Sequence, residues 1–164
     1  MSKASERFHE TVIDFLEVIS SCIQDLRQAR MTSFTSVNVD VARVYLTNFP
    51  GDDLLFSFID HHVHWNNIHT HNNRFILEDI PELSGDMKGV SVPMLTCPFE
   101  AYEKHGAKSP VTKDDIDTLW DYFEAMVCIS CNFIFNERRS NPSFRSEIDI
   151  EKYAMLFSIT LKHD

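Results

Sequence analysis

Apolar side chains recur at steps of three and four near the start of the chain, through Phe8, Val12 and Phe15 and on to Leu26. This spacing puts them on one face of an α-helix. Acidic residues lie early in the same stretch and basic residues lie late, an order that suits the helix dipole. The pattern predicts one long amphipathic helix over residues 5–30.

A second long helix is predicted to begin after Thr112. Thr112 and Asp115 have the spacing of a capping box, with Asp in place of the usual Glu. Apolar residues then follow on one face for about five turns of helix, so we expect this helix at the centre of the fold. The residues on its apolar face are Ile116, Leu119, Trp120, Phe123, Met126, Val127, Ser130, Phe133 and Ile134.

Three shorter segments also have helical patterns. Residues 37–46 are mixed, because their valines alternate as in a strand while Asn38 or Asp40 could cap a helix. We favour a helix there, since no partner strand is evident. A third helix is predicted over residues 52–62, after a Pro-Gly turn, and a last one over residues 150–161.

The middle of the chain, residues 78–111, is the least periodic part, with prolines and glycines between short apolar clusters. We predict a long irregular connection here, with a short helix before it at residues 74–77 and one or two helical turns at residues 98–104. Such connections are uncommon inside a compact domain and are often functional, so this is the first candidate for a binding loop. Together the elements predict an all-α fold: a single compact helical bundle of about five main helices over residues 1–164.

The composition indicates a folded, acidic domain. Apolar residues make up 43% of the chain, and thirteen Phe suggest a core or an exposed face built from large rings. The net charge of −10 argues against direct nucleic-acid binding, which depends on Lys and Arg contacts with phosphates. No stretch approaches the ~20 apolar residues of a membrane span and no signal peptide is evident, so we expect an intracellular protein without membrane contact.

Histidines cluster within residues 61–71. Imidazole is a common ligand of zinc, and two His-x-His pairs bring several rings within range of one another. The tract lacks the His-Glu-x-x-His and His-x-His-x-Asp-His patterns of metallohydrolases, so we expect no cofactor and interpret the tract as solvated or helix-capping histidines. A zinc site is the alternative. Its candidate ligands are His61, His64, His69 and His71.

Cys128 and Cys131 have the Cys-x-x-Cys spacing of redox pairs and zinc knuckles. They lie deep inside the second long predicted helix, whereas a redox pair is activated at a helix N-terminus. We therefore expect a buried or half-buried pair of small side chains here, and free thiols at all four cysteines of the chain.

An acidic stripe runs opposite the apolar face of the same helix. Such a stripe is typical of a solvated face, and the alternative is electrostatic docking of a basic partner. Its residues are Asp114, Asp117, Asp121 and Glu124.

Residues 112–123 resemble a stretch found in uncharacterised proteins of large eukaryotic double-stranded DNA viruses, in which a capped polar start leads into a helix with Trp-x-Tyr. Residues 92–99, Val-Pro-Met-Leu-Thr-Cys-Pro-Phe, are similar to a proline-aromatic loop of those proteins, and residues 8–26 look like their first helix. The histidine tract departs from the pattern. The resemblance implies a viral structural or accessory protein in the host cytoplasm or the virion, and it implies no catalytic residues.

The sequence favours a non-enzymatic structural or protein-interaction module that binds another protein or itself. The Phe excess and the negative charge support this, as does the lack of a Gly-rich phosphate loop or a Gly-x-Ser-x-Gly elbow. The alternative is a metal-binding protein or metal-dependent enzyme centred on residues 61–71. A third hypothesis, from charge alone, is an acidic mimic of nucleic acid.

Overall fold

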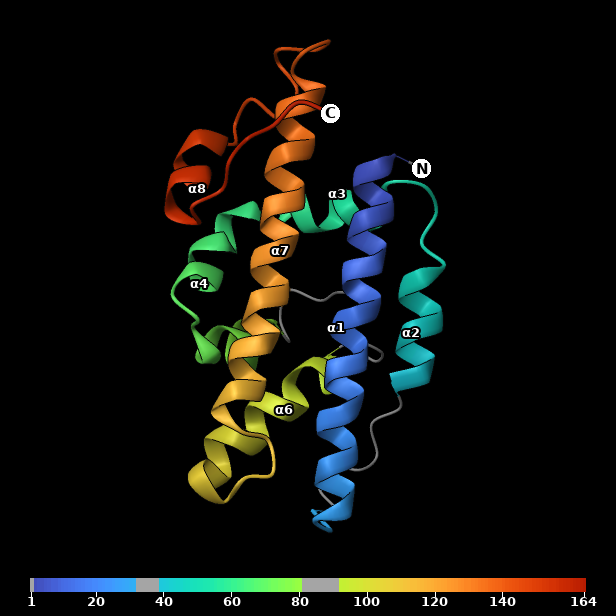
Figure 1. Ribbon diagram of the computed structural model, residues 1–164, viewed down its shortest axis with the longest axis vertical. Helices are drawn as coiled ribbons and strands as arrows, with labels where there is room; N and C mark the ends of the chain where they lie inside the picture. Colours follow the sequence, from blue (N-terminus) through green and yellow to red (C-terminus); the bar gives the residue numbers. More distant parts are fainter. Residues whose placement is uncertain (1, 32–38, 81–91) are drawn as a thin grey trace.

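The computed structural model describes residues 2–31, 39–80 and 92–164, and every regular element within these ranges is a helix. The predicted all-α fold is confirmed, although the helices outnumber the five main ones expected. Two long helices lie side by side at the centre (Figure 1): α1 (Lys3–Gln28) and α7 (Lys113–Glu137), which run in opposite directions. No helix in the described ranges is both long enough and apolar enough to cross a membrane.

The shorter elements surround this pair. On the outer side of α1 lies α2, while α3 contacts both long helices, α4 and α8 contact α7, and α6 contacts α1 and α7. Their bounds are α2 (Val39–Thr47), α3 (Asp53–Asp60), the 3₁₀ turn η2 (His62–His64), α4 (Trp65–His69), the π-helical turn η3 (Phe75–Asp79), α6 (Val92–His105), the 3₁₀ turn η5 (Gly106–Lys108) and α8 (Ile150–Leu156).

Side-chain caps fix where the two long helices begin. The backbone N–H of Ser5 donates to the Ser2 hydroxyl at the start of α1. At the start of α7, the N–H of Asp115 donates to the Thr112 hydroxyl, and the N–H of Thr112 donates to the Asp115 carboxylate. The predicted capping box is therefore confirmed, with its two otherwise unpaired N–H groups satisfied by local side chains.

The phenylalanine excess belongs to the core. Every Phe in the described ranges is buried or half-buried. Phe15 of α1 packs edge-on against Phe123 of α7, with ring centroids 5.1 Å apart, and Phe8 meets Phe58 of α3 at 5.4 Å. Rings of this size bury large apolar areas and stabilise the α1–α7 packing through directional ring contacts.

The helix interpretation of residues 37–46 is confirmed by α2, with Val37 and Asn38 outside the described residues. The expected irregular connection at residues 78–111 is wrong over its second half, where α6 spans Val92–His105. Pro98 lies inside α6 and cannot donate a backbone hydrogen bond there. The helix continues because Met94, Cys97 and Phe99 are buried, and this packing outweighs the local penalty. Residues 81–91 of that connection lie outside the described residues.

The predicted last helix is too long, because α8 ends at Leu156 and Ser158 then takes a left-handed φ of 55°. The chain continues along α7 instead. The N–H of Lys162 donates to Asn132 Oδ1 at 2.8 Å, and the N–H of Asp164 donates to Asn136 Oδ1 at 2.9 Å. Two asparagines of α7 thus hold the C-terminal segment through its backbone.

Candidate functional site

The four histidines proposed as metal ligands have different neighbours. His61 donates from Nδ1 to the Ser57 carbonyl oxygen at 2.8 Å. His64 stacks on Phe75, His69 packs edge-on against Phe157, and His71 stacks on Trp120. The closest approach among the described contacts is between His61 and His64, whose ring centroids lie 6.5 Å apart.

The described residues contain no group of three or more His, Cys, Asp or Glu side chains arranged to hold a metal ion. The histidines spread because the 3₁₀ turn η2 and helix α4 rotate successive side chains to different sides of the backbone. The structure therefore brings His61 and His64 near each other, and places His69 and His71 against other aromatic partners.

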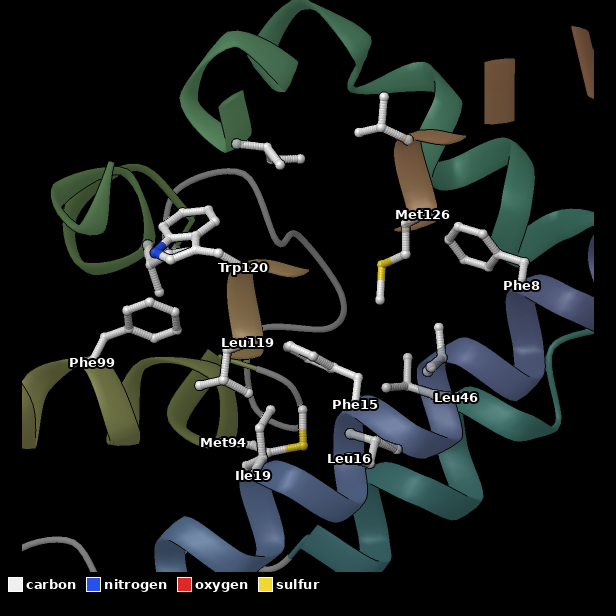
Figure 2. Packing of buried hydrophobic residues seen from close by; sticks show 14 of the residues in the cluster. Phe8, Phe15, Leu16, Ile19, Leu46, Met94, Phe99, Leu119, Trp120 and Met126 are labelled. Carbon is white, nitrogen blue, oxygen red and sulfur yellow. The ribbon is translucent and has the colours of Figure 1, made fainter. Parts of the chain in front are cut away.

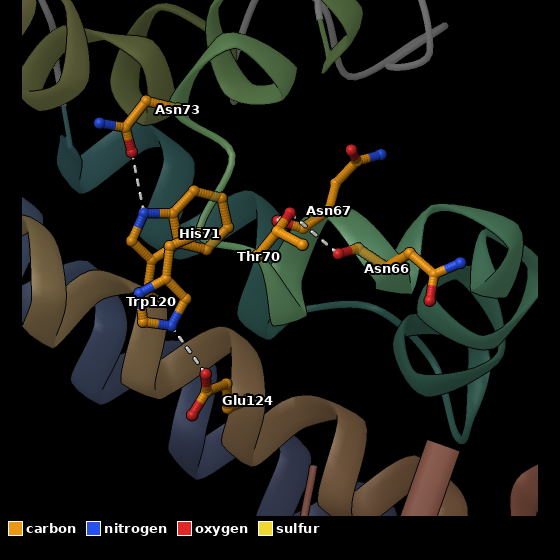
Figure 3. A network of polar contacts seen from close by, with 7 residues as sticks. All are labelled: Asn66, Asn67, Thr70, His71, Asn73, Trp120 and Glu124. Atoms are coloured by element: carbon orange, nitrogen blue, oxygen red, sulfur yellow. Dashed lines mark hydrogen bonds and ion pairs between the residues drawn. The ribbon is translucent and has the colours of Figure 1, made fainter. Parts of the chain in front are cut away.

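His71 belongs to a polar network on α7 (Figure 3). Its Nε2 lies 2.8 Å from Glu124 Oε1, and its ring lies parallel to the Trp120 indole, with centroids 5.5 Å apart. The buried Trp120 donates from Nε1 to Asn73 Oδ1 at 2.9 Å, and Asn73 Nδ2 donates to Glu103 of α6. These contacts tie the segment after α4 to α7 and α6, and they give His71 and Glu124 a structural role.

Three cysteines are buried as free thiols: Cys22, Cys97 and Cys131. Burial raises the pKa of each of these thiols to about 12. Cys128 is half-buried and also free. A thiol with so high a pKa stays protonated at neutral pH and is a poor nucleophile, so Cys131 has the buried, inert character expected from its place inside α7.

The acidic stripe on α7 is partly paired. Asp117 accepts from Lys113 Nζ at 2.9 Å and Glu124 contacts His71, whereas Asp114 and Asp121 are exposed. A neighbouring polar groove between α1 and α7 adds more carboxylates. The residues lining this groove are Asp14, Glu17, Val18, Ser21, Asp115, Thr118 and Tyr122.

The outer face of α2 carries exposed apolar side chains. Val41 is 53% exposed, Val44 60% and Tyr45 39%, and the i, i+3, i+4 spacing puts them on one side of the helix. The opposite side, with Ala42 and Leu46, is buried against the core. α2 is therefore apolar on both sides, whereas a helix that covers a core on one side usually has a polar outer side.

An apolar cavity of about 270 Å³ lies between the helices and is partly open to solvent. Phe8 and Phe15 of α1 and Met126 of α7 line part of it, and Figure 2 shows their side chains among the buried residues between the helices. Further walls come from α2, α3, α4, η3 and α6, through residues such as Leu46, Trp65 and Met94. The side chains that line it are mostly apolar, so apolar ligand atoms in contact with them would be removed from water.

No protein-family model, curated protein or solved structure matches this chain.

Sequence reasoning did not identify the cavity or the α2 face. The cavity residues belong to the same helical stripes as the close-packed core residues, so nothing local distinguishes Phe8 or Met126 from Leu16. The α2 face was readable in part, because Val41, Val44 and Tyr45 have helical spacing, but which side of α2 faces solvent depends on its packing against α1.

Proposed function

We propose that this protein is a non-catalytic interaction module that binds a basic, amphipathic helix of a partner protein on the outer face of α2. The observation that carries the proposal is the exposed apolar row of Val41, Val44 and Tyr45. Tyr45 also packs edge-on against Phe49, with ring centroids 5.5 Å apart, which extends the row toward the end of α2. Helices commonly dock by laying an apolar face of i, i+3, i+4 anchors on such a surface.

Charge favours a basic partner. Glu10, Asp14 and Glu17 are exposed and share one side of α1, because they are spaced four and three residues apart. Glu17 Oε1 lies 2.6 Å from Arg43 of α2, so this acidic row lies where α1 meets α2. Arg43 also pairs with Asp40 at 3.0 Å, so this junction keeps a net negative charge. Long lysine or arginine side chains of a partner helix on α2 would be attracted to this charge.

The whole protein also has a net charge of −10, and this charge would speed the encounter with a basic partner. A role as a virion-associated or accessory protein is compatible with such binding and rests on the resemblance of residues 112–123, 92–99 and 8–26. It remains part of the proposal.

The test uses a displayed library of helical peptides, randomised at both apolar and charged positions, and selects for binding to the full chain. We expect enriched peptides with apolar residues at helical spacing flanked by Lys or Arg, and affinity that falls as salt rises. Val44→Asp should weaken the selected peptides at least about tenfold, since it places a charge in the apolar contact. Val63→Asp is the matched control, because Val63 is 64% exposed on η2.

Two results would overturn the proposal. One is equal weakening of peptide binding by Val44→Asp and Val63→Asp, which would show that the peptides do not bind on the outer face of α2. The other is concentration-dependent dimerisation in sedimentation analysis that Val44→Asp abolishes, since a second copy would then be the occupant.

A further inference from the structure

The polar side chains that line the cavity come from one short stretch of the chain. Its side-chain hydroxyl and imidazole groups come from Ser57, His61 and His64, which lie within two turns at the end of α3 and in η2. The walls contributed by α1, α6 and α7 are apolar, with Phe15, Met94 and Met126 among them. A ligand that fits such a site has a polar group at one end and an apolar body.

His61 lines the cavity and is exposed to solvent. Its Nδ1 donates to the Ser57 carbonyl oxygen, so Nδ1 carries a proton and Nε2 is the remaining ring atom for a ligand. As an imidazolium, His61 can donate from Nε2 to an anionic oxygen in a charge-assisted hydrogen bond. His64 is half-buried and stacked on Phe75, with centroids 5.4 Å apart, which holds its ring at the cavity wall.

Trp65 provides a second indication of an acceptor near this stretch of the chain. It follows His64 directly, lines the cavity and is only 1% exposed. Its indole Nε1 has no hydrogen-bond acceptor among the described residues. A buried N–H normally has a partner, and a ligand oxygen near residues 57–65 would supply one.

The neighbouring charges do not oppose an anion there. Asp60 precedes His61 but is exposed and paired with Arg145. The Arg145 guanidinium also lies over the Phe56 ring, 5.6 Å from its centroid, so it is held beside α3. The carboxylate nearest to His61 in the sequence is thus engaged by a cation.

The volume sets the length of the apolar body. An engineered cavity of about 150 Å³ holds one benzene, so about 270 Å³ has room for roughly eleven non-hydrogen atoms. We propose that the cavity binds a free medium-chain carboxylic acid of about ten carbons. Its chain lies between Phe8, Phe15 and Met126, and its carboxylate lies at His61 and His64. This site is separate from the α2 docking face.

Isothermal titration with sodium decanoate, below its micelle concentration, tests the proposal on the full chain. We expect one decanoate per chain and weaker binding of both butanoate and hexadecanoate, which underfill and overfill the cavity. His61→Ala should weaken decanoate about tenfold by removing a charge-assisted hydrogen bond. His69→Ala, a change in the same tract at a ring packed on Phe157, should leave the affinity unchanged.

Val12→Phe tests the cavity itself, because Val12 lines it from α1 and the larger ring would occupy ligand space. This variant should lose decanoate binding while keeping the circular dichroism spectrum of the parent. If Val12→Phe fails to fold, Ser57→Leu is the second variant, since its larger side chain fills part of the cavity from α3 and should also abolish binding.

Three outcomes would overturn the proposal: unchanged binding in the folded cavity-filling variants, equal affinity for 1-decanol and decanoate, or binding only to phosphatidylcholine vesicles. The first would show that decanoate does not bind in the cavity. The second would show that the carboxylate is not recognised, and the third would show that the bound chain belongs to a membrane lipid. Val44→Asp should leave decanoate binding intact, so failure of this proposal is distinguishable from failure of the α2 docking face.

Discussion

The hydrogen bond between Trp120 and Asn73 offers a quantitative test of the packing around α7. Trp120 is 1% exposed, and its Nε1 donates to Asn73 Oδ1 at 2.9 Å. Asn73→Ala would leave this N–H buried without its acceptor. It would also remove the exposed hydrogen bond from Asn73 Nδ2 to Glu103.

The cost follows from these two losses. A buried donor left without an acceptor costs about 1–3 kcal/mol, and the exposed contact with Glu103 adds about 0.5 kcal/mol. Asn73→Ala should therefore lower the free energy of unfolding by about 2 kcal/mol, which corresponds to roughly 4–8 °C in Tm for a chain of this length. In a Trp120→Phe background the donor is already gone, so the same change should cost only about 0.5 kcal/mol.

The assay is a double-mutant cycle of the parent, the two single variants and the double variant, unfolded with urea and followed by far-ultraviolet circular dichroism. The loss of Trp120 packing on His71 and Phe99 appears in both arms and cancels. We expect a coupling energy of about 1–2 kcal/mol between the two positions. Additivity within about 0.5 kcal/mol would refute the reasoning, because the Trp120–Asn73 bond would then contribute nothing specific.

Two further predictions concern ionisable groups. Asp52 accepts from Ser5 Oγ and from the N–H of Ser2, and these hydrogen bonds hold the pKa of its carboxyl below the usual value. A lowered pKa in the folded state stabilises the fold above the ordinary Asp pKa, and this contribution is lost as pH falls through the folded pKa. Asp52→Asn should therefore lower the free energy of unfolding at pH 7, measured in urea. Below about pH 4 the free energy of unfolding of the variant should change less with pH than that of the parent. The same dependence of this free energy on pH in both proteins would contradict the prediction. The second prediction concerns the thiols: a disulfide reagent at pH 8 should modify the half-buried Cys128 first in the folded chain, and all four cysteines in urea. The reason is that buried thiols such as Cys131, with a pKa of about 12, stay protonated in the folded chain. Rapid modification of Cys131 in the native state would contradict the burial argument.

The features predicted correctly from the sequence depend on neighbours within one or two helical turns. The long first helix and the capping box of Thr112 and Asp115 follow from spacing and cap chemistry that residues impose on their own surroundings. The errors occurred where distant packing outweighed local preference. α6 continues through Pro98 because its apolar residues are buried, and α8 stops early because the C-terminal segment bonds to Asn132 and Asn136 instead.

The candidate sites show the same division. The sequence identified the histidine tract as unusual. The structure places His61 and His64 among the residues that line the cavity, and it packs His69 on Phe157 and His71 on Trp120. By itself the sequence determined the two long helices, the place of the cysteine pair inside α7 and the acidic charge, because these depend on composition and on spacing along one helix. Only the tertiary structure decided which side of α2 faces solvent and which rings enclose the cavity, because both depend on how several helices, distant in sequence, fill the space between them.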